Sequence, residues 1–134
     1  MNNCIFCKIV NGEIPCSKIY DDELVMSFLD VNPTSDGHLL VIPKEHYENV
    51  ADAPEEVLTR ISKICKKMGL LVKDKLGASG FNIINASGKD AQQSVFHLHF
   101  HVVPRYKNDG LDLWFHGKAG DKEKIKEIKK KLLS

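Results

Sequence analysis

Residues 94–105 read SVFHLHFHVVPR, and three of the six histidines of the chain stand at every second position of this otherwise apolar run. A β-strand sends alternate side chains to opposite faces of a sheet. His97, His99 and His101 are therefore predicted to share one face of a strand, with Leu98 and Phe100 on the other. The pattern predicts a functional site that is built on a strand.

Ordinary packing is the alternative explanation for these histidines. A histidine is often half buried and satisfied by backbone carbonyls. Each buried imidazole without a hydrogen-bond partner, however, costs about 1–3 kcal/mol, and imidazoles packed together discourage one another's protonation. A purely structural origin for three alternating histidines is costly, so the sequence favours a chemical role.

The composition limits the class of protein. The chain of 134 residues is 43% hydrophobic, which predicts a single globular domain over residues 1–134. Its formal net charge is +1, so we expect no nucleic-acid or membrane partner, although the segment KEKIKEIKKKLL is locally basic. The N-terminal residues MNNCIFCKIVNGEIP do not resemble a secretion signal, which predicts a cytoplasmic protein. Its four cysteines are then expected to be thiols or metal ligands rather than disulfides.

The apolar periodicity predicts the elements of this domain. A hairpin is expected within residues 17–30, and further strands at residues 38–43, 80–85 and 95–104. A long amphipathic helix is predicted from an N-cap at Asp52 to a stop at Gly77. A shorter helix closes the chain, and its apolar face is formed by Ile125, Ile128 and Leu132. Hairpins with one crossing helix predict an α+β domain with a five-stranded, mainly antiparallel sheet.

The triad run resembles the signature of the histidine triad (HIT) family, His-φ-His-φ-His-φ-φ with φ apolar. The segments CIFCKIVNGEIP, FLDVNPTSDGHLLVIPKEH and HLHFHVVPR are similar in order and spacing to the Hint branch of that family, so the resemblance covers residues 4–106. It implies a HIT-like fold whose sheet is extended by dimerisation, with a core at 4–106 and a C-terminal segment and helix at 107–134. It also implies a homodimer that binds a purine nucleotide.

The resemblance implies a nucleotidyl hydrolase or transferase in which the middle histidine, His99, attacks the α-phosphate of a purine nucleoside phosphoramidate or related nucleotide. A neutral imidazole, with an ordinary pKa of about 6.5, keeps a lone pair for such an attack when its other nitrogen is held by a hydrogen bond. Water would then discharge the covalent nucleotidyl-histidine, while His101 donates a hydrogen bond where charge develops. His38 matches a fourth active-site histidine that orients the triad, or it is an exposed histidine at the start of a strand.

The resemblance also implies which residues contact the nucleotide. Asp30 matches a carboxylate that accepts from both ribose hydroxyls. Five residues match the apolar walls of a purine pocket, although they would otherwise be assigned to the core: Ile5, Phe6, Ile9, Phe28 and Val31. In the polar loop, Ser94 and the backbone of Gln92 and Gln93 are predicted to donate to phosphate, with the amide of Asn85, unless this is an ordinary hairpin loop. The family usually has glycine where Gln92 stands.

Cys4 and Cys7 form a Cys-x-x-Cys pair, which suits a tetrahedral Zn²⁺ ion with two further nitrogen or sulfur ligands. A redox pair of the thioredoxin type is a weaker interpretation, because no βαβ pattern surrounds it. The resemblance to zinc-containing bacterial Hint relatives implies His46 and His97 as the other ligands of a structural zinc, with Cys16 in reserve. His97 would then have structural and orienting roles. Unpaired thiols without a metal remain an alternative.

Two classes of function stay open. The first is an enzyme, for which dinucleoside polyphosphate hydrolysis is an alternative to phosphoramidate hydrolysis because it uses the same nucleophile. The second is a slow-turnover nucleotide-binding scaffold module with the basic C-terminal helix as its contact surface. A binding module needs no nucleophile aligned between two other histidines, so the triad favours the enzyme. In Hint relatives the C-terminal segment crosses the dimer, which places Trp114 near the pocket.

Overall fold

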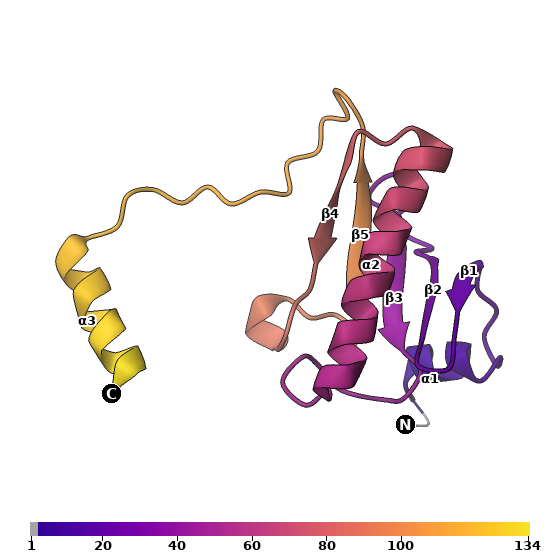
Figure 1. Ribbon diagram of the computed structural model, residues 1–134, viewed down its shortest axis with the longest axis horizontal. Helices are drawn as coiled ribbons and strands as arrows, with labels where there is room; N and C mark the ends of the chain where they lie inside the picture. Colours follow the sequence, from indigo (N-terminus) through magenta and orange to yellow (C-terminus); the bar gives the residue numbers. More distant parts are fainter. Residues whose placement is uncertain (1–2) are drawn as a thin grey trace.

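The computed structural model describes residues 3–134. The five strands form one sheet in the order β1-β2-β3-β5-β4, with every neighbouring pair antiparallel. The long helix α2 crosses one face of this sheet (Figure 1). The predicted α+β fold and five-stranded antiparallel sheet are therefore confirmed. The elements are, in chain order, α1 (Ile5–Val10), β1 (Lys18–Asp21), β2 (Val25–Leu29), β3 (Leu39–Pro43), α2 (Glu55–Leu76), β4 (Gly80–Ile84), a 3-10 helix (Lys89–Ala91), β5 (Phe100–Arg105) and α3 (Lys122–Leu133).

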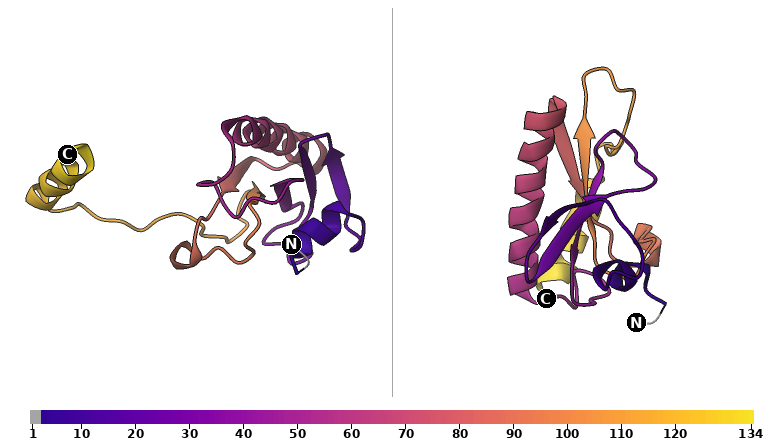
Figure 2. Two further views of the ribbon diagram at one scale, coloured as in Figure 1. Left: turned by 90° about the horizontal axis from the view of Figure 1, so that it is seen from below. Right: turned by 90° about the vertical axis from the view of Figure 1, so that its right-hand side faces the viewer.

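The central strand β3 is buried on both faces, which explains its unbroken apolar sequence LLVIP. Leu39 and Val41 pack under the apolar face of α2. Leu40 and Ile42 point to the opposite face, where they pack with Phe6 of α1. Figure 2 shows α1 and α2 on opposite sides of the sheet. Each fully buried aliphatic side chain contributes about 1.5–3 kcal/mol, so β3 anchors both layers.

The helix α2 ends where the sequence predicts and begins later than predicted. Gly77 adopts a left-handed conformation with φ 72°, and its N–H bonds the carbonyl of Val72. At the other end Pro54, not Asp52, occupies the N-cap, and no side chain caps the helix. The carboxylate of Asp52 instead accepts hydrogen bonds from the backbone of Glu48 and Asn49, at 3.1 and 3.0 Å. The capping prediction was wrong because this carboxylate closes the preceding turn.

The strand that carries the triad is shorter than predicted. β5 begins at Phe100, so His97 and His99 precede the ladder rather than lie within it. The pairing of β3 with β5 stops at Val41 and Phe100. Pro43 at the end of β3 has no N–H to donate, and its carbonyl accepts from His97 Nε2 at 2.9 Å. This side-chain bond replaces the continuation of the ladder.

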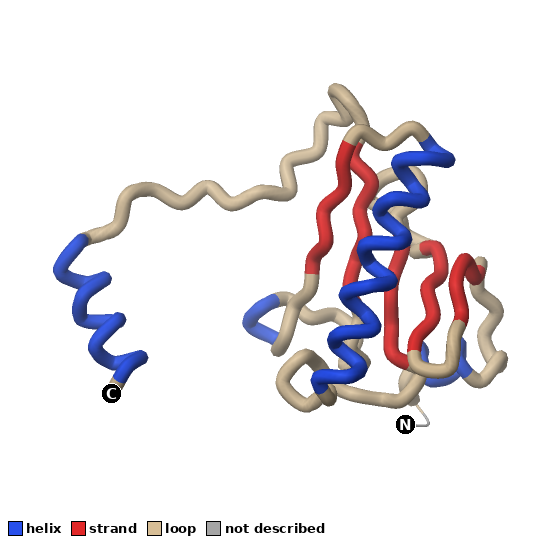
Figure 3. The backbone as a smooth tube through the Cα atoms, viewed as in Figure 1, coloured by secondary structure: helices blue, strands red, loops and turns tan. Residues whose placement is uncertain are grey.

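Beyond the sheet, the chain continues as an arm, defined here as residues 107–134. The arm runs past the β4 edge as an extended segment and ends in α3 (Figures 1 and 3). α3 has the predicted apolar face, but none of its residues is buried. Among the described residues, no helix is both long and apolar enough to span a membrane.

Candidate active site and metal centre

The structure brings three of the predicted histidines together. His99 and His101 have ring centroids 5.1 Å apart, and His38, which precedes β3, lies 5.2 Å from His101. His97 is completely buried, and His99 is only 7% exposed. The chain bends at residues 95–97 and enters β5 only at Phe100, so the three alternating histidines do not share a regular strand face.

His99 presents an unprotonated nitrogen. Its Nδ1 lies 2.8 Å from the carbonyl oxygen of His97. A carbonyl can only accept, so Nδ1 carries the proton and Nε2 carries the lone pair. Burial lowers the pKa of His99, which keeps the ring neutral at pH 7. Nε2 has no hydrogen-bond partner among the described residues, so its lone pair is not committed to a donor.

His38 and His101 form a hydrogen-bonded pair, with Nε2 of His38 3.0 Å from Nδ1 of His101. The backbone N–H of Thr34 donates to His38 Nδ1 at 3.0 Å, so the proton of His38 is on Nε2. Burial lowers the pKa of both rings, and for His101 burial and its neighbours His99 and His38 lower the pKa to about 4. Both rings are therefore neutral at pH 7.

The carboxylate of Asp30 completes this group, with one oxygen 3.6 Å from His38 Nε2. Asp30, His38 and His101 also hold potential ligand atoms within 4.8 Å of one another. A metal bound there would have to displace the proton from His38 Nε2, because the other nitrogen of that ring already accepts from Thr34. The group is consequently better suited to proton chemistry than to metal binding.

His97 belongs to a second cluster, with both cysteines of the Cys-x-x-Cys pair. Its Nε2 donates to Pro43 and leaves Nδ1 as a lone pair, which lies 3.3 Å from Cys4 Sγ and 3.5 Å from Cys7 Sγ. His46 Nδ1 lies 3.4 Å from Cys7 Sγ. The four ligand atoms lie within 4.8 Å of one another, as the predicted zinc ligands require.

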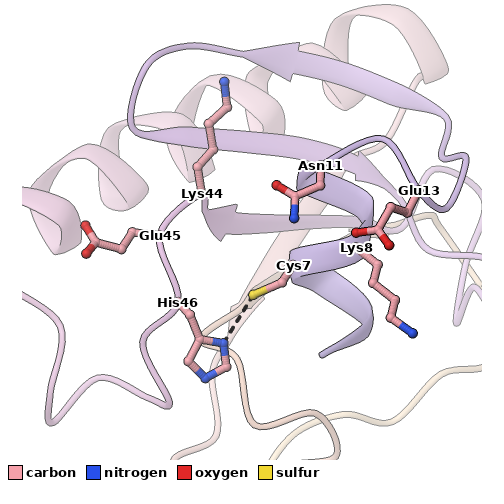
Figure 4. Close-up of a pocket in the computed structure, with 7 residues that line it drawn as sticks. All are labelled: Cys7, Lys8, Asn11, Glu13, Lys44, Glu45 and His46. Carbon is pink, nitrogen blue, oxygen red and sulfur yellow. Dashed lines mark hydrogen bonds between the residues drawn. The ribbon is translucent and has the colours of Figure 1, made fainter. Parts of the chain in front are cut away.

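The chemistry of this donor set fits a metal ion. Two sulfurs and two imidazole nitrogens form one of the common structural zinc sets. Burial and the neighbouring Cys4 raise the pKa of the Cys7 thiol to about 11. A bound dication would reverse this shift, because it stabilises thiolates. Cys7 and His46 line an open pocket of about 640 Å³, so solvent reaches this side of the cluster. Figure 4 shows both side chains among the residues that line it.

A smaller pocket of about 290 Å³ lies between α1, β2 and the loop after Asn85. All five predicted apolar wall residues line it, together with Asp30 and Ser94. Asp30 accepts from the backbone of Asn32 with one oxygen, at 2.8 Å. Seven further residues line the pocket and were not predicted from the sequence, although several of them are sequence neighbours of predicted residues: Ile14, Pro15, Cys16, Leu29, Asn32, Leu40 and Val95. Cys16 thus lines the pocket and is not part of the metal cluster.

The loop before the triad differs from its predicted role. The N–H groups of Gln92 and Gln93 donate within the loop, to the carbonyls of Lys89 and Gly88, so they are not free for a phosphate. The buried side chain of Gln93 holds the loop together. Gln92 has φ 69°, a left-handed conformation that glycine adopts without strain.

The amide of Asn85 is also engaged. Its Nδ2 donates to the backbone carbonyl of His99 at 2.9 Å. Ser94 lines the pocket without a hydrogen bond from its side chain to another described residue. Of the predicted phosphate donors, Ser94 is therefore the one that lines the pocket and whose hydroxyl makes no hydrogen bond to another described residue.

Comparison with known proteins identifies the class of this domain. The family model of the HIT domain matches residues 11–108, so the chain belongs to the HIT family. It is 37% identical to an adenosine 5'-monophosphoramidase of Saccharomyces cerevisiae, over 98% of this chain and 81% of the relative. It is 40% identical to an adenylylsulfatase of Arabidopsis thaliana, over 82% of this chain and 56% of the relative. These relatives support a nucleotide hydrolase activity.

Solved structures agree with the fold. The crystal structure of SMU.412c from Streptococcus mutans matches with a TM-score of 0.92 and 38% identity, over 99% of this chain and 85% of that chain. A zinc-bound histidine triad family protein from Mycobacterium smegmatis matches with a TM-score of 0.81 and 38% identity, over 87% of this chain and 85% of that chain. The HIT fold is thus shared across the sheet and α2.

Proposed function

We propose that this protein is a nucleotidyl hydrolase or transferase that cleaves purine nucleoside phosphoramidates at the α-phosphate through a covalent intermediate on His99. The observation that carries the proposal is the neutral His99 ring, whose unprotonated Nε2 is not committed to a donor while Nδ1 is held by the carbonyl of His97. The naming of one relative as an adenosine 5'-monophosphoramidase supports this substrate class.

The reaction takes place in two displacements. In the first, the Nε2 lone pair of His99 attacks the α-phosphorus, the phosphorus–nitrogen bond breaks, and the departing amine takes its proton from solvent while the Nε2–H of His101 donates a hydrogen bond to it. The ring of His99 becomes positively charged, and its Nδ1–H bond to the His97 carbonyl stabilises that charge. In the second, water attacks phosphorus and gives up its proton to solvent, and the bond between phosphorus and Nε2 of His99 breaks, which returns His99 to its neutral form.

Recognition of the nucleotide rests on the pocket beside α1. Its apolar walls, including Phe6 and Phe28, enclose a flat base, and a carboxylate oxygen of Asp30 accepts from the ribose hydroxyls. Ser94 donates to a phosphate oxygen. The pocket has little polar side-chain chemistry with which to read a base edge, so binding of a purine depends mainly on its size and apolar faces.

Zinc has a structural role in this proposal. Cys4, Cys7, His46 and His97 hold one Zn²⁺ ion, which, when bound, ties the N-terminal segment to the segment that carries the nucleophile. Four protein ligands leave no open position for a catalytic water. The zinc-bound relative from Mycobacterium smegmatis supports the assignment.

The protein is proposed to work as a homodimer. β4 lies at an open edge of the sheet, and its Ile83 is 48% exposed. An unpaired apolar edge is a ready site for another strand. The arm runs past this same edge (Figure 1) and carries exposed Trp114 and Phe115, which are available to cover a second copy. A purely monomeric protein in sedimentation at micromolar concentration would contradict this assembly.

Incubation with a panel of leaving groups tests the function. The panel contains an adenosine phosphoramidate, an adenylyl sulfate and a dinucleoside polyphosphate, and mass spectrometry of acid-quenched protein detects the nucleotidyl adduct. We expect an adduct on the parent and none on His99→Ala, which should still bind nucleotide within a few-fold of the parent affinity. Turnover by His99→Ala at the parent rate would contradict the mechanism. Binding of nucleotide without any adduct would support the scaffold alternative.

A further inference from the structure

The loop between β2 and His38, residues 31–37, is held at two points by the far end of β5. The hydroxyl of Ser35 donates to the carbonyl of Pro104 at 2.7 Å. The hydroxyl of Tyr106 donates to the carbonyl of Asp36 at 2.6 Å. These two hydrogen bonds join the loop to the strand that carries His101, and they lie outside the residues that contact the nucleotide pocket.

The same loop supplies the backbone N–H that decides the proton positions in the active site. Thr34 donates to Nδ1 of His38 at 3.0 Å, so the single proton of neutral His38 is on Nε2. That Nε2–H points at Nδ1 of His101, 3.0 Å away. Nδ1 of His101 therefore accepts, and the proton of neutral His101 is left on Nε2.

The same two rings have a second arrangement of their protons, in which both tautomers are reversed. If the Thr34 N–H moved away, His38 could carry its proton on Nδ1 and use Nε2 as an acceptor. His101 would then be driven to hold its proton on Nδ1, and its Nε2 would become a lone pair that cannot donate. Asp30, 3.6 Å from His38 Nε2, favours the observed arrangement more weakly because of its greater distance.

We infer that Tyr106 and Ser35 are positioning residues, which clamp the loop so that the Thr34 N–H fixes the tautomers of His38 and His101 and keeps Nε2 of His101 a hydrogen-bond donor. Neither side chain touches the reacting atoms. Gly37 permits the close seating of this loop, since it has φ 87° and a Cβ there would collide with Leu76 of α2. The inference rests on the proposed function for its kinetic consequence, whereas the tautomers can be observed without any turnover.

Nitrogen NMR of protein labelled in its histidine rings measures the tautomers directly. For the parent we expect the Nε2–H form at both His38 and His101. For the double variant Ser35→Ala/Tyr106→Phe, which keeps the ring of Tyr106, we expect a mixture of tautomers at both. Tyr47→Phe is the matched control, because within the described part of the chain its hydroxyl bonds only the exposed Glu45 side chain. Unchanged tautomers in the folded double variant would overturn the inference.

A comparison of leaving groups measures the consequence. A phosphoramidate releases an amine that needs a proton, whereas a nucleoside 4-nitrophenyl phosphate releases a stable anion that does not. Because removal of one hydrogen-bond donor from a site of developing charge costs about 10²–10³ in kcat, we expect the double variant to lose about tenfold or more in kcat on the phosphoramidate and less than about threefold on the aryl ester. Equal losses on both substrates would show a merely structural role and overturn the inference. If the parent cleaves neither substrate, the proposed function fails, and the NMR measurement still decides the role of the clamp.

Discussion

Gln93→Ala is expected to destabilise the fold while leaving nucleotide binding nearly unchanged. The side chain of Gln93 is 6% exposed and makes three hydrogen bonds. Its Nε2 donates to the carbonyls of Glu48 and Val95 at 2.6 and 3.0 Å, and its Oε1 accepts from the N–H of Gly88 at 2.8 Å. Together these bonds join the turn before α2 to the loop before the triad.

The magnitude follows from the three bonds. Each hydrogen bond contributes about 0.5–1.5 kcal/mol net, so the loss of three gives about 3 kcal/mol in the free energy of unfolding. With a urea slope of about 2 kcal/mol per molar, the midpoint of unfolding falls by about 1.5 M. Water that enters the vacated space would move the loss toward the lower end of the range.

Urea unfolding followed by circular dichroism measures this loss, with Gln92→Ala as the matched control. The neighbouring Gln92 is exposed and makes no side-chain hydrogen bond with another described residue, so its replacement should change the free energy of unfolding by less than about 0.5 kcal/mol. Equal midpoints for the two variants, together with a large loss of nucleotide affinity in Gln93→Ala, would refute the reasoning and return Gln93 to the phosphate site.

Three further predictions concern the metal, the core and the pH dependence. Purified protein is expected to contain about one zinc per chain, and a chelator should lower its Tm; an unaltered Tm would identify the cysteines as ordinary thiols. Gly69→Ala should destabilise the protein by about 1–2 kcal/mol in thermal or urea unfolding, because its new Cβ overlaps the ring of Phe81, and the loss should be relieved by adding Phe81→Leu. The Arg105 guanidinium, with two backbone N–H groups, holds the pKa of Asp109 well below its usual range. A carboxyl group whose pKa is lower in the folded state stabilises the fold at pH values above its unfolded pKa of about 3.9. Asp109→Asn should therefore show its full destabilisation at pH 6 and a smaller one below pH about 4. The difference between the urea midpoints of the variant and the parent measures it.

The sheet and α2 could be predicted from local patterns because they depend on periodicity and on Gly77. α1 could not, since its six residues form a helix only through contacts made elsewhere. Cys4 caps it by accepting from the N–H of Cys7 at 3.4 Å, and Phe6 buries against β2 and β3. A helix this short has no stability of its own and no period long enough to recognise.

The alternating histidines and the Cys4–Cys7 pair stand out in the sequence because their residue types and spacing have few other uses, whereas His46 was added to them only by the family resemblance. The loop donors could not be assigned in this way. A polar loop residue can donate to a ligand or to its own loop, and Gln93 does the latter. The hydrogen bond that holds Ser35 to Pro104 also could not be predicted from the sequence, because these residues come together only when β3 pairs with β5.

The arm described above gives the molecule a shape that its mass does not reveal. A compact domain of 134 residues has a radius of gyration of about 14 Å. In this protein, residues 107–134 extend away from the body (Figure 2), so a single chain in solution scatters X-rays as a body with a tail. In the proposed dimer the tail lies along a second copy, and each chain regains a compact outline. Small-angle scattering across a dilution series therefore follows the docking of the arm through shape, in addition to the change in mass.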